Sequence, residues 1–352
     1  MKTQMNATTL VAMIKEVNSH VKPSEIQALT IDTTDKAVTV STYTSHAQLA
    51  YTLANARVQP LETGTITVDY KQANKLLKLI KEGLITISAD DEKTSLATAD
   101  TNFTLTDKPY SSMDKGTQQG SITVATKDLV TALKQAKHSL NKQDSSPVLT
   151  AYHISLQDGQ LTIVATDSHT LSKHVIDANG QDFDVVVRGA DLVKALSGAK
   201  LSDTLTITDY TNCIEITDMN HKFLIATIDV NYPDIERIIP TQNSTTISLD
   251  TKQLTKATKY DKALEADYAC LTVAETGITL TDDKHSFTTT LDSSYDGETV
   301  DIAINPTLLL EALETITEDH VCIKCGGSLR PIVISGSNEF DHLEVVCPTR
   351  RF

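Results

Sequence analysis

The stretch LTIVATDSHTL, residues 161–171, decides how the chain is interpreted. Leu161, Ile163 and Ala165 alternate with other residues, which predicts a strand with one buried face. The strand is followed by a short polar segment of sequence Thr-Asp-Ser-His, residues 166–169, called the turn below. Polar side chains at a strand end lie at a surface, so we expect the turn to be available to another molecule.

A second decisive stretch, NYPDIERIIP at residues 231–240, follows about sixty residues later and is called the linker below. Pro233 and Pro240 stand near its two ends. Proline is excluded from helix interiors and favours extended backbone in the residue before it. The pattern therefore predicts a stiff, extended connection between two folded parts.

Length and composition predict several globular domains. Of 352 residues, 40% are hydrophobic, which is enough for two or three domains that each bury a core. The formal net charge of −15 argues against a simple nucleic-acid binder, because attraction to phosphate needs positive surface. The chain has no N-terminal apolar run of signal-peptide length and no stretch near 18 consecutive apolar residues, so we expect a cytoplasmic protein.

The five cysteines are expected to be reduced thiols, because their number is odd and most lie in segments typical of strands. Cys322 and Cys325 form an isolated CxxC pair. A zinc site needs a second Cys or His pair nearby, and Cys347 alone does not supply one. The sequence therefore predicts no metal site and no cofactor.

A repeated order of elements predicts three copies of one domain. Leu76, Leu192 and Leu309 occupy the same place in the second helix of each copy, 116 and 117 residues apart. We place the domains at residues 1–119, 120–240 and 241–352, with a polar segment, residues 111–120, at the first boundary. Apolar residues at helical spacing predict two helices in each copy, at residues 6–17, 71–82, 126–142, 189–200, 251–262 and 306–317.

The expected fold class is α+β, with antiparallel sheets and two helices in each domain. About eight short segments per copy alternate between apolar and polar residues. This alternation favours antiparallel sheets that helices cover on one face over a parallel α/β fold, whose strands run continuously apolar.

The helical segments are basic although the chain is acidic. They hold 15 lysines and 7 acidic residues, which leaves 16 basic and 39 acidic residues elsewhere. The spacing i, i+4, i+7 occurs twice and forms a stripe along one helix face each time, with Lys71, Lys75 and Lys78 and with Lys252, Lys256 and Lys259. The candidate DNA-binding residues are Lys22, Lys71, Lys75, Lys78, Lys127, Lys134, Lys137, Lys194, Lys252, Lys256 and Lys259.

For any single helix, a solvated basic face is the alternative interpretation. No aromatic residue or arginine stands among the stripe lysines, so stacking on single strands and reading of bases are not expected. What remains is attraction to phosphate without sequence readout, which suits a protein that holds duplex DNA and slides along it.

Both decisive stretches resemble signatures of one family. ATDSHTL and YPDIERIIP resemble the ATDGHRL and YPD-x-x-R-hydrophobic-hydrophobic-P motifs of the bacterial DNA polymerase III beta sliding clamps. The ending VVCPTR, residues 345–350, is similar to that family's VVMPMR. Four positions depart from the family's usual residues: Ser168, Thr170, Cys347 and Leu308. The tail also continues to Phe352. These departures fit a divergent, phage- or plasmid-type member of the family.

The resemblance implies a processivity factor, not an enzyme. Clamps of this family have three similar domains per chain, close head to tail into a homodimeric ring, and line the hole with helices. They encircle duplex DNA, and a hydrophobic groove binds peptides of the polymerase, the clamp loader and other partners. The segment NFTLTDKP, residues 102–109, resembles the strand that clamps pair across the subunit interface, which implies an interface role for Phe103 and Leu105.

The same resemblance implies that the turn, the linker, the C-terminal tail and neighbouring loops form the groove. Carried over motif by motif, the groove residues are Leu149, Thr166, His169, Leu171, Pro233, Arg237, Ile238, Asn305, Leu308, Leu329, Pro331, Val345, Val346, Cys347, Pro348, Thr349 and Arg350.

Two other classes of function agree with parts of the sequence. A Thr-rich array of β-domains could be a scaffold or a surface adhesin, and the absence of a signal peptide speaks against the adhesin. Asp167 and His169, with Ser168 between them, could form a hydrolase site. Adjacent side chains on extended backbone point to opposite faces, however, and the chain contains no G-x-S-x-G, H-E-x-x-H or P-loop motif.

Overall fold

The computed structural model describes residues 1–54, 58–80, 82–90, 93–109, 112–141, 143, 146–197 and 201–351. Lys81, Lys142 and residues 198–200, at the ends of three expected helices, lie outside the described residues, as do Ser111 and Phe352. The chain divides into two units: Met1–Val130 with Gln157–Gly159 and Asp177–Ile228, and Thr131–Leu156 with Gln160–Ile176 and Asp229–Phe352.

A helix forms in each segment where helical spacing predicts one. These helices are α1 (Ala7–Ser19), α2 (Tyr70–Leu79), α3 (Thr126–Ala136), α4 (Gly189–Leu196), α5 (Thr251–Ala263) and α6 (Pro306–Leu313). Four of them, α2, α3, α4 and α6, end earlier than predicted. After α3 ends at Ala136, the chain continues as a 3-10 turn, η2 (Lys137–Ser139). After α6, the Thr315 hydroxyl donates a hydrogen bond to the Ala312 carbonyl, which would otherwise lack a partner at the helix end. No described helix is long and apolar enough to cross a membrane.

The first unit contains two antiparallel sheets. One has the order β5-β1-β7-β8-β9, and the other runs β6-β2-β3-β4-β17-β16-β15-β10. The strands of this unit are β1 (Lys2–Asn6), β2 (Ala28–Thr33), β3 (Ala37–Tyr43), β4 (Ala47–Ala54), β5 (Val58–Glu62), β6 (Gly64–Asp69), β7 (Leu84–Ala89), β8 (Thr94–Ala97), β9 (Asn102–Leu105), β10 (Gln118–Ala125), β14 (Phe183–Arg188), β15 (Thr204–Tyr210), β16 (Cys213–Thr217) and β17 (His221–Ala226).

The second unit also contains antiparallel sheets. One has the order β21-β20-β19-β23, and another runs β22-β18-β24-β25-β26-β13. Its elements include the 3-10 turns η3 (Pro147–Thr150) and η4 (Ile235–Arg237), and its strands are β11 (Ala151–Gln157), β12 (Gln160–Thr166), β13 (Thr170–Gly180, whose end belongs to the first unit), β18 (Thr245–Asp250), β19 (Ala269–Ala274), β20 (Gly277–Asp282), β21 (Thr288–Leu291), β22 (Ser293–Gly297), β23 (Val300–Ile304), β24 (His320–Cys325), β25 (Ile332–Ser335) and β26 (His342–Val346).

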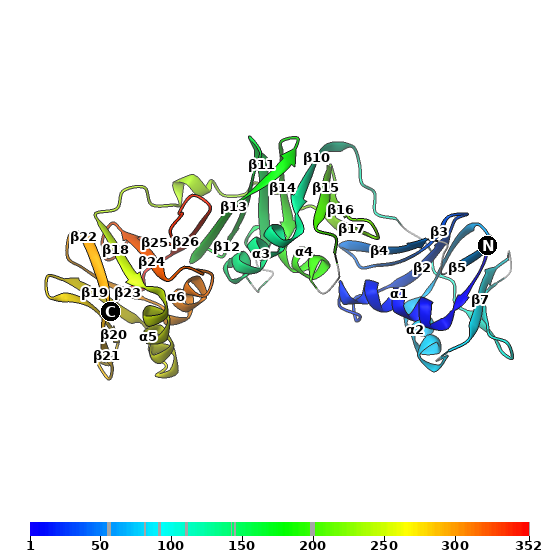
Figure 1. The fold of residues 1–352 in the computed structure, drawn as a ribbon, viewed down its shortest axis with the longest axis horizontal. Coiled ribbons are helices and arrows are strands. Elements are labelled where there is room, and N and C mark those ends of the chain that lie inside the picture. The colour runs from blue at the N-terminus through cyan, green and yellow to red at the C-terminus, as the bar shows by residue number, and fades with distance from the viewer. Residues whose placement is uncertain are drawn as a thin grey trace. The chain divides into compact units, whose positions relative to one another are not determined.

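The same strand order recurs along the chain. It appears as β5-β1-β7-β8-β9, as β13-β10-β15-β16-β17 through the end of β13, and as β22-β18-β24-β25-β26. In the first unit, α1 and α2 contact each other and cover one face of β2, β3 and β4 (Figure 1). In the second, α5 packs on α6 and on β20 and β21. Antiparallel sheets with a few covering helices confirm the α+β prediction.

The helices attach to the sheets through the apolar residues that spacing indicates. Leu10, Met13, Ile14 and Val17 of α1 are all buried. Burial of one such side chain contributes roughly 1.5–3 kcal/mol. The opposite face of each helix is exposed to water, and on α2 this face carries Lys71, Lys75 and Lys78.

A buried carboxylate fastens β13 to β26 in the second unit. Glu344 is fully buried and accepts hydrogen bonds from Ser172 Oγ at 2.7 Å, His342 Nε2 at 2.9 Å and His138 Nε2 at 3.1 Å. Burial alone would raise the pKa of Glu344, but the bonds from His138 and His342 outweigh it and bring that pKa to about 2. The carboxylate is therefore ionised, and the paired strands are held by charge-assisted bonds as well as by their backbone ladder.

Candidate functional site: the turn, the tail and the basic helices

The turn is fixed by its own side chains. Strand β12 ends at Thr166, and the Asp167 carboxylate oxygen Oδ1 then accepts bonds from His169 N at 2.9 Å, Thr170 N at 2.7 Å and Thr170 Oγ1 at 3.0 Å. Ser168 has φ 77°, in the left-handed region that favours glycine. Ser168 and His169 are exposed, so the turn presents both side chains to solvent.

This geometry does not resemble a hydrolase triad. The Asp167 oxygen that a triad would direct at His169 Nδ1 is bonded to the turn backbone and to Thr170 instead. In the part of the chain that the structure describes, no interaction joins the Ser168 hydroxyl to the His169 ring. The three residues build a turn and show no activated nucleophile.

The C-terminal tail, residues 347–351, lies beside the turn. Strand β26 pairs with β13, with Val345 opposite Leu171, and Cys347 N then donates a hydrogen bond to His169 O at 2.9 Å. Further along, Thr349 N donates to Ala303 O at 2.8 Å. Two stretches that are far apart in sequence thus share one surface, and backbone hydrogen bonds hold them together.

An ion pair that sequence reasoning missed anchors the end of the tail. The Arg351 guanidinium forms two hydrogen bonds of 2.7 Å with the two oxygens of Asp301. These bonds hold the pKa of Asp301 at about 2. The only signal in the sequence was the extra basic residue after Arg350, and nothing there indicated its partner on β23.

The linker is not extended throughout, contrary to the prediction. Its middle forms the 3-10 turn η4, with Ile238 N bonded to Ile235 O at 2.9 Å. Each proline restrains only itself and the residue before it, so the segment between Pro233 and Pro240 is free to turn. The linker packs with Tyr232, Ile235 and Ile239 against a buried cluster of Val164, Leu171, Val333, Leu343 and Val345.

Four predicted groove residues prove to be core. Thr166, Leu171, Val345 and Val346 are at most 4% exposed, because the β13–β26 pair covers them. They support the surface from beneath. Asn305 caps α6, its side chain accepting a bond from Thr307 N at 2.9 Å.

The remaining groove residues reach the surface. Ile238 is 40% exposed and Leu329 70%, unusual values for large apolar side chains. The Arg237 side chain is 87% exposed and pairs with Asp234 at 3.0 Å. The exposed positions also include His169 and Arg350, and the half-buried ones are Leu149, Pro233, Leu308, Pro331, Cys347, Pro348 and Thr349.

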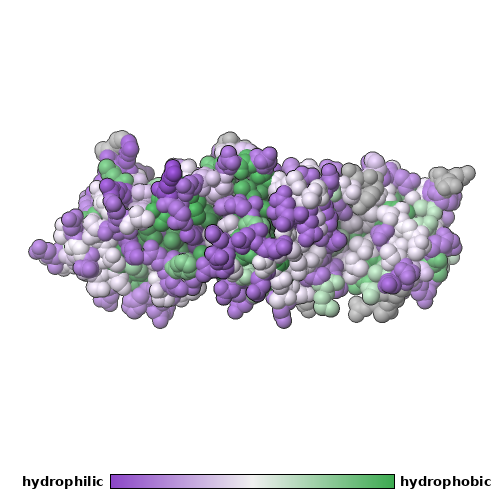
Figure 2. Space-filling view, turned by 90° about the horizontal axis from the view of Figure 1, so that it is seen from above, coloured by the Kyte–Doolittle hydropathy of each residue, from purple (hydrophilic) through white to green (hydrophobic). Residues whose placement is uncertain are grey.

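A hollow of about 540 Å³ adjoins the tail, a size typical of ligand sites. Leu329, Thr349 and Arg351 line it, together with Val300, Asp301, Ala303 and the Gly327–Ser328 backbone, none of which sequence reasoning named. In Figure 2, hydrophobic side chains gather in patches between the left third and the centre of the view. Burial raises the pKa of the Cys347 thiol, so this tail residue stays uncharged.

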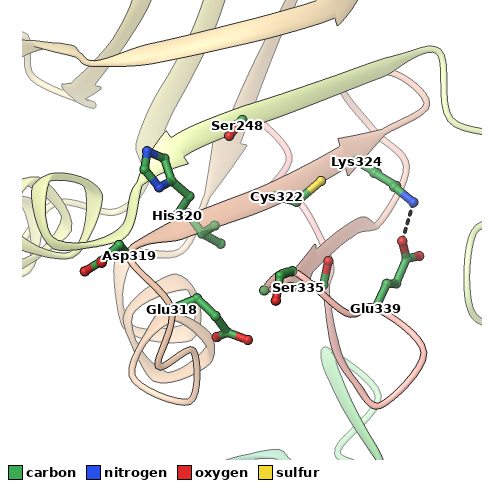
Figure 3. A pocket seen from close by; sticks show the side chains of 11 residues that line it. Ser248, Glu318, Asp319, His320, Cys322, Lys324, Ser335 and Glu339 are labelled. Carbon is green, nitrogen blue, oxygen red and sulfur yellow. Dashed lines mark hydrogen bonds and ion pairs between the residues drawn. The ribbon is translucent and has the colours of Figure 1, made fainter.

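A second hollow in this unit is polar. Glu318, Asp319, His320, Lys324 and Glu339 line it, and Lys324 forms an ion pair with Glu339 (Figure 3). Cys322 also lines it, whereas Cys325 is buried and lies on the other face of β24. Such a lining suits water and ions better than an apolar peptide, so this hollow is not part of the groove.

The candidate DNA-binding lysines lie mostly on exposed helix faces. Those of α2, α3, η2 and α5 are exposed, whereas Lys194 of α4 is half-buried, and Lys22 lies after α1 and pairs with Glu25 at 3.4 Å. On α5 the stripe is partly neutralised, because Lys252 pairs with Asp319 at 3.1 Å and Lys259 with Glu314 at 3.7 Å. Among the described residues, the α2 lysines Lys71, Lys75 and Lys78 have no ion-pair partner.

In the described part of the chain, β9 and β21 each lie at an edge of their sheet, as β5 and β23 do at the opposite edges. Strand β9 pairs with β8 on one side, and β21 pairs with β20 on one side. Phe103 on β9 is half-buried and available, but Leu105 is only 5% exposed and belongs to the core of its own chain. The interface roles of Phe103 and Leu105 therefore stay predictions, with Phe103 at the surface and Leu105 beneath it.

Comparison with known proteins identifies the family. Two family models match consecutive parts of the chain: the DNA polymerase III beta subunit N-terminal domain at residues 121–238 and its C-terminal domain at residues 236–350. The chain belongs to the DNA polymerase III beta subunit family. The beta sliding clamp of Streptococcus pneumoniae is 25% identical over 299 residues, covering 81% of this chain and 75% of that protein.

Solved clamp structures share the fold over the full length. The sliding clamp of Bacillus subtilis matches with a TM-score of 0.85 at 18% identity, and the DNA polymerase III subunit beta of Pseudomonas aeruginosa with 0.86 at 19% identity. Each comparison covers 100% of both chains. At such identities the fold is shared while individual surface residues differ.

The strained backbone at Ser168 yields a stability prediction. Ser168→Gly should raise the free energy of unfolding by up to about 1 kcal/mol, because glycine adopts positive φ without a Cβ clash. Ser146→Gly is the matched control, since Ser146 has φ −145° and makes no capping bond; it should lower stability. Urea unfolding of both variants measures the difference. A Ser168→Gly variant that is less stable than the parent would contradict the strain argument.

Proposed function

We propose that this protein is the ring-forming clamp of a replication machine, with clamp domains at residues 1–119, 120–240 and 241–352. Two chains close head to tail around duplex DNA and tether the polymerase, the clamp loader and other proteins that carry clamp-binding peptides. Family membership gives the role of processivity factor. The recurring strand order supports three similar domains.

The observation that carries the proposal is the shared surface of turn, linker and tail. The bond from Cys347 N to His169 O and the β13–β26 pairing bring together the three stretches that carry the family motifs. Leu329 and Ile238 expose apolar surface there, and a hollow lies beside the tail. This arrangement suits the apolar side chains of a short extended peptide, with the exposed His169 and Arg237 able to donate hydrogen bonds.

The proposal excludes catalysis by the turn and places the protein in the cytoplasm, with the DNA it serves. Asp167, the only carboxylate in the candidate triad, is bonded to the turn itself.

Surface substitutions test the peptide groove. The parent should bind a Gln-x-x-Leu-x-Phe peptide with micromolar affinity, roughly −8 kcal/mol. Leu329→Asp with Ile238→Asp should weaken binding at least tenfold, because both would place a charge on exposed apolar surface. Met219→Asp is the matched control, since Met219 is 89% exposed in the first unit. Fluorescence anisotropy measures the affinities.

Equal binding by the double variant, or no saturable binding by the parent, would refute the groove. Substitutions are preferable to removal of the tail, because truncation also deletes the Cys347–His169 bond and the Arg351–Asp301 pair.

Contact with DNA should depend more on α2 than on α5. Its lysines carry no neutralising partner among the described residues, unlike Lys252 and Lys259 of α5. Each phosphate neutralised contributes about 0.9 to the slope of log binding constant against log salt. Contacts of this kind are independent of sequence and let a ring slide.

Charge reversal on the two helices should therefore differ in effect. Changing Lys71, Lys75 and Lys78 to Glu should weaken retention on circular DNA and flatten its salt dependence more than the same change at Lys252, Lys256 and Lys259. A set of exposed lysines outside the helices, Lys36, Lys93 and Lys284, serves as charge-matched control. Retention across a salt series is the measurement. If all three variants lose retention on DNA to the same extent, the loss follows net charge alone. That result would show that the helix lysines do not contact DNA specifically.

The unpaired edges suggest how two chains meet. Within the chain, β17 pairs with β4 in the first unit and β26 pairs with β13 in the second, both antiparallel. Strand β9 is the last strand in its sheet, and β17 and β26 are the last strands in the two corresponding strand orders. Strand β21 occupies the edge position in its sheet that β4 occupies next to β3. Pairing of β9 with β21 of a second chain would repeat the same junction and remove both free edges.

A charge on β9 tests this pairing. Phe103→Asp should give a folded monomer of 38.3 kDa where the parent gives twice that mass, because an unpaired charge is costly to bury. Phe340→Asp is the control, since Phe340 is 62% exposed and lies elsewhere. Light scattering after gel filtration measures the mass, and circular dichroism checks the fold. A folded variant that stays dimeric would exclude Phe103 from the interface.

A further inference from the structure

Three potential metal ligands converge within the first unit, away from the groove and the lysine stripes. Glu16 and His20 lie at the end of α1, four residues apart and hence on one face, and His221 begins β17. Glu16 Oε1 is 3.3 Å from His221 Nε2 and 3.8 Å from His20 Nε2. All three ligand atoms lie within 4.8 Å of one another.

The other ring nitrogens fix which tautomer is present. His20 Nδ1 is 2.5 Å from Ala195 O, and a carbonyl oxygen only accepts, so Nδ1 carries the proton. His221 Nδ1 is 3.0 and 3.1 Å from the two oxygens of Asp218, again an acceptor. His20 Nε2 therefore bears a lone pair when the ring is neutral, and His221 can offer Nε2 to a metal ion once its proton is displaced. A histidine whose second nitrogen is held by a carbonyl or a carboxylate is the usual arrangement around protein-bound zinc.

These three atoms are only partly satisfied. His221 bridges two carboxylates, with Nδ1 on Asp218 and Nε2 within hydrogen-bond distance of Glu16 Oε1, whereas His20 Nε2 is buried with no hydrogen-bond partner among the described residues. An unsatisfied buried acceptor costs about 1–3 kcal/mol. A cation at the centre would satisfy His20 Nε2 and would replace the proton shared by His221 Nε2 and Glu16 Oε1.

The spacing suits a small divalent ion. Zinc bonds to imidazole nitrogen and carboxylate oxygen at about 2.0–2.2 Å in tetrahedral geometry, which separates its ligand atoms by roughly 3.3–3.5 Å. The two distances from Glu16 Oε1, 3.3 and 3.8 Å, bracket that separation, and the two imidazole nitrogens lie within 4.8 Å of each other. The Glu16 side chain is 33% exposed, so water can reach a fourth position.

A second histidine cluster shows what a satisfied network looks like. His174, His342 and Glu344 in the other unit also hold ligand atoms within 4.8 Å. There the histidine rings stack, with centroids 4.1 Å apart and planes at 17°, and Ser172 and His138 donate to the carboxylate. His20 and His221 instead meet edge to face, at 5.6 Å and 65°, and of the two only His221 has its Nε2 within hydrogen-bond distance of the carboxylate.

We propose that Glu16, His20 and His221 bind one divalent transition-metal ion of the zinc class. Imidazole with carboxylate favours zinc, cobalt or nickel over calcium or magnesium, which prefer oxygen ligands. The ion fastens α1 to β17, two elements that are otherwise joined within this unit through the β4–β17 pairing. Binding to the folded state alone stabilises the unit by mass action.

The test uses the full-length chain without a histidine tag, in a Cys322→Ser, Cys347→Ser background that removes the partly exposed thiols. Zinc binding is measured by calorimetry, and cobalt serves as a spectroscopic probe of a nitrogen–oxygen tetrahedral site. We expect one ion per chain, a dissociation constant in the micromolar range or below, and a melting temperature that rises with zinc and returns with chelator.

The variants separate this site from adventitious binding. Glu16→Gln keeps size and fold and should weaken binding at least tenfold, as should His221→Gln. Glu25→Gln is the matched control, because its carboxylate is 47% exposed and pairs with Lys22 at the surface. Unchanged zinc affinity in both site variants, or no saturable one-to-one binding by the parent, would overturn the proposal. If His221→Gln fails to fold, the Glu16→Gln result decides.

Discussion

The structure depends on one constraint: a strand edge must find a hydrogen-bonding partner. Each recurring sheet ends in a strand whose outer edge would otherwise be exposed, and an exposed edge invites aggregation. In the first unit β17 satisfies its edge on β4, and in the second β26 does so on β13. Backbone pairing thus merges sheets that could each have ended separately, and it does so independently of side-chain identity.

The same pairing positions the candidate site. Because β26 lies against β13, the residues that follow β26 emerge beside the turn that precedes β13, and the Cys347–His169 bond continues the ladder. The apolar residues at this junction, such as Val345 and Leu171, are buried in the core and are not accessible to a partner. The surface left for a partner consists of loop residues around them, whose positions the rigid pair fixes. Loops on a rigid scaffold are a common place for binding sites.

Polar groups secure both junctions, in different ways. At the β13–β26 pair, Glu344 is ionised and its oxygens accept from several donors, so the network is closed. Beside the β4–β17 pair, His221 hydrogen-bonds to Glu16 and Asp218, but the buried His20 Nε2 has no hydrogen-bond partner among the described residues, so the network is open. A closed network stabilises by itself, whereas an open one needs a cation. The contrast follows from which ring nitrogen the neighbouring carbonyl or carboxylate holds.

Local periodicity alone determined the six helices, the antiparallel character of the strands and the basic stripes, because those features depend on residues a few positions apart. The motifs at residues 161–171 and 231–240 likewise indicated the family. Tertiary structure decided the rest. The 3-10 turn at Ile235, the burial of Val345 and Leu105, the pairing of Arg351 with Asp301 and the neutralisation of Lys252 all depend on partners distant in sequence. The convergence of His20 with His221 is the clearest case, since about two hundred residues separate them and only the strand pairing brings them together.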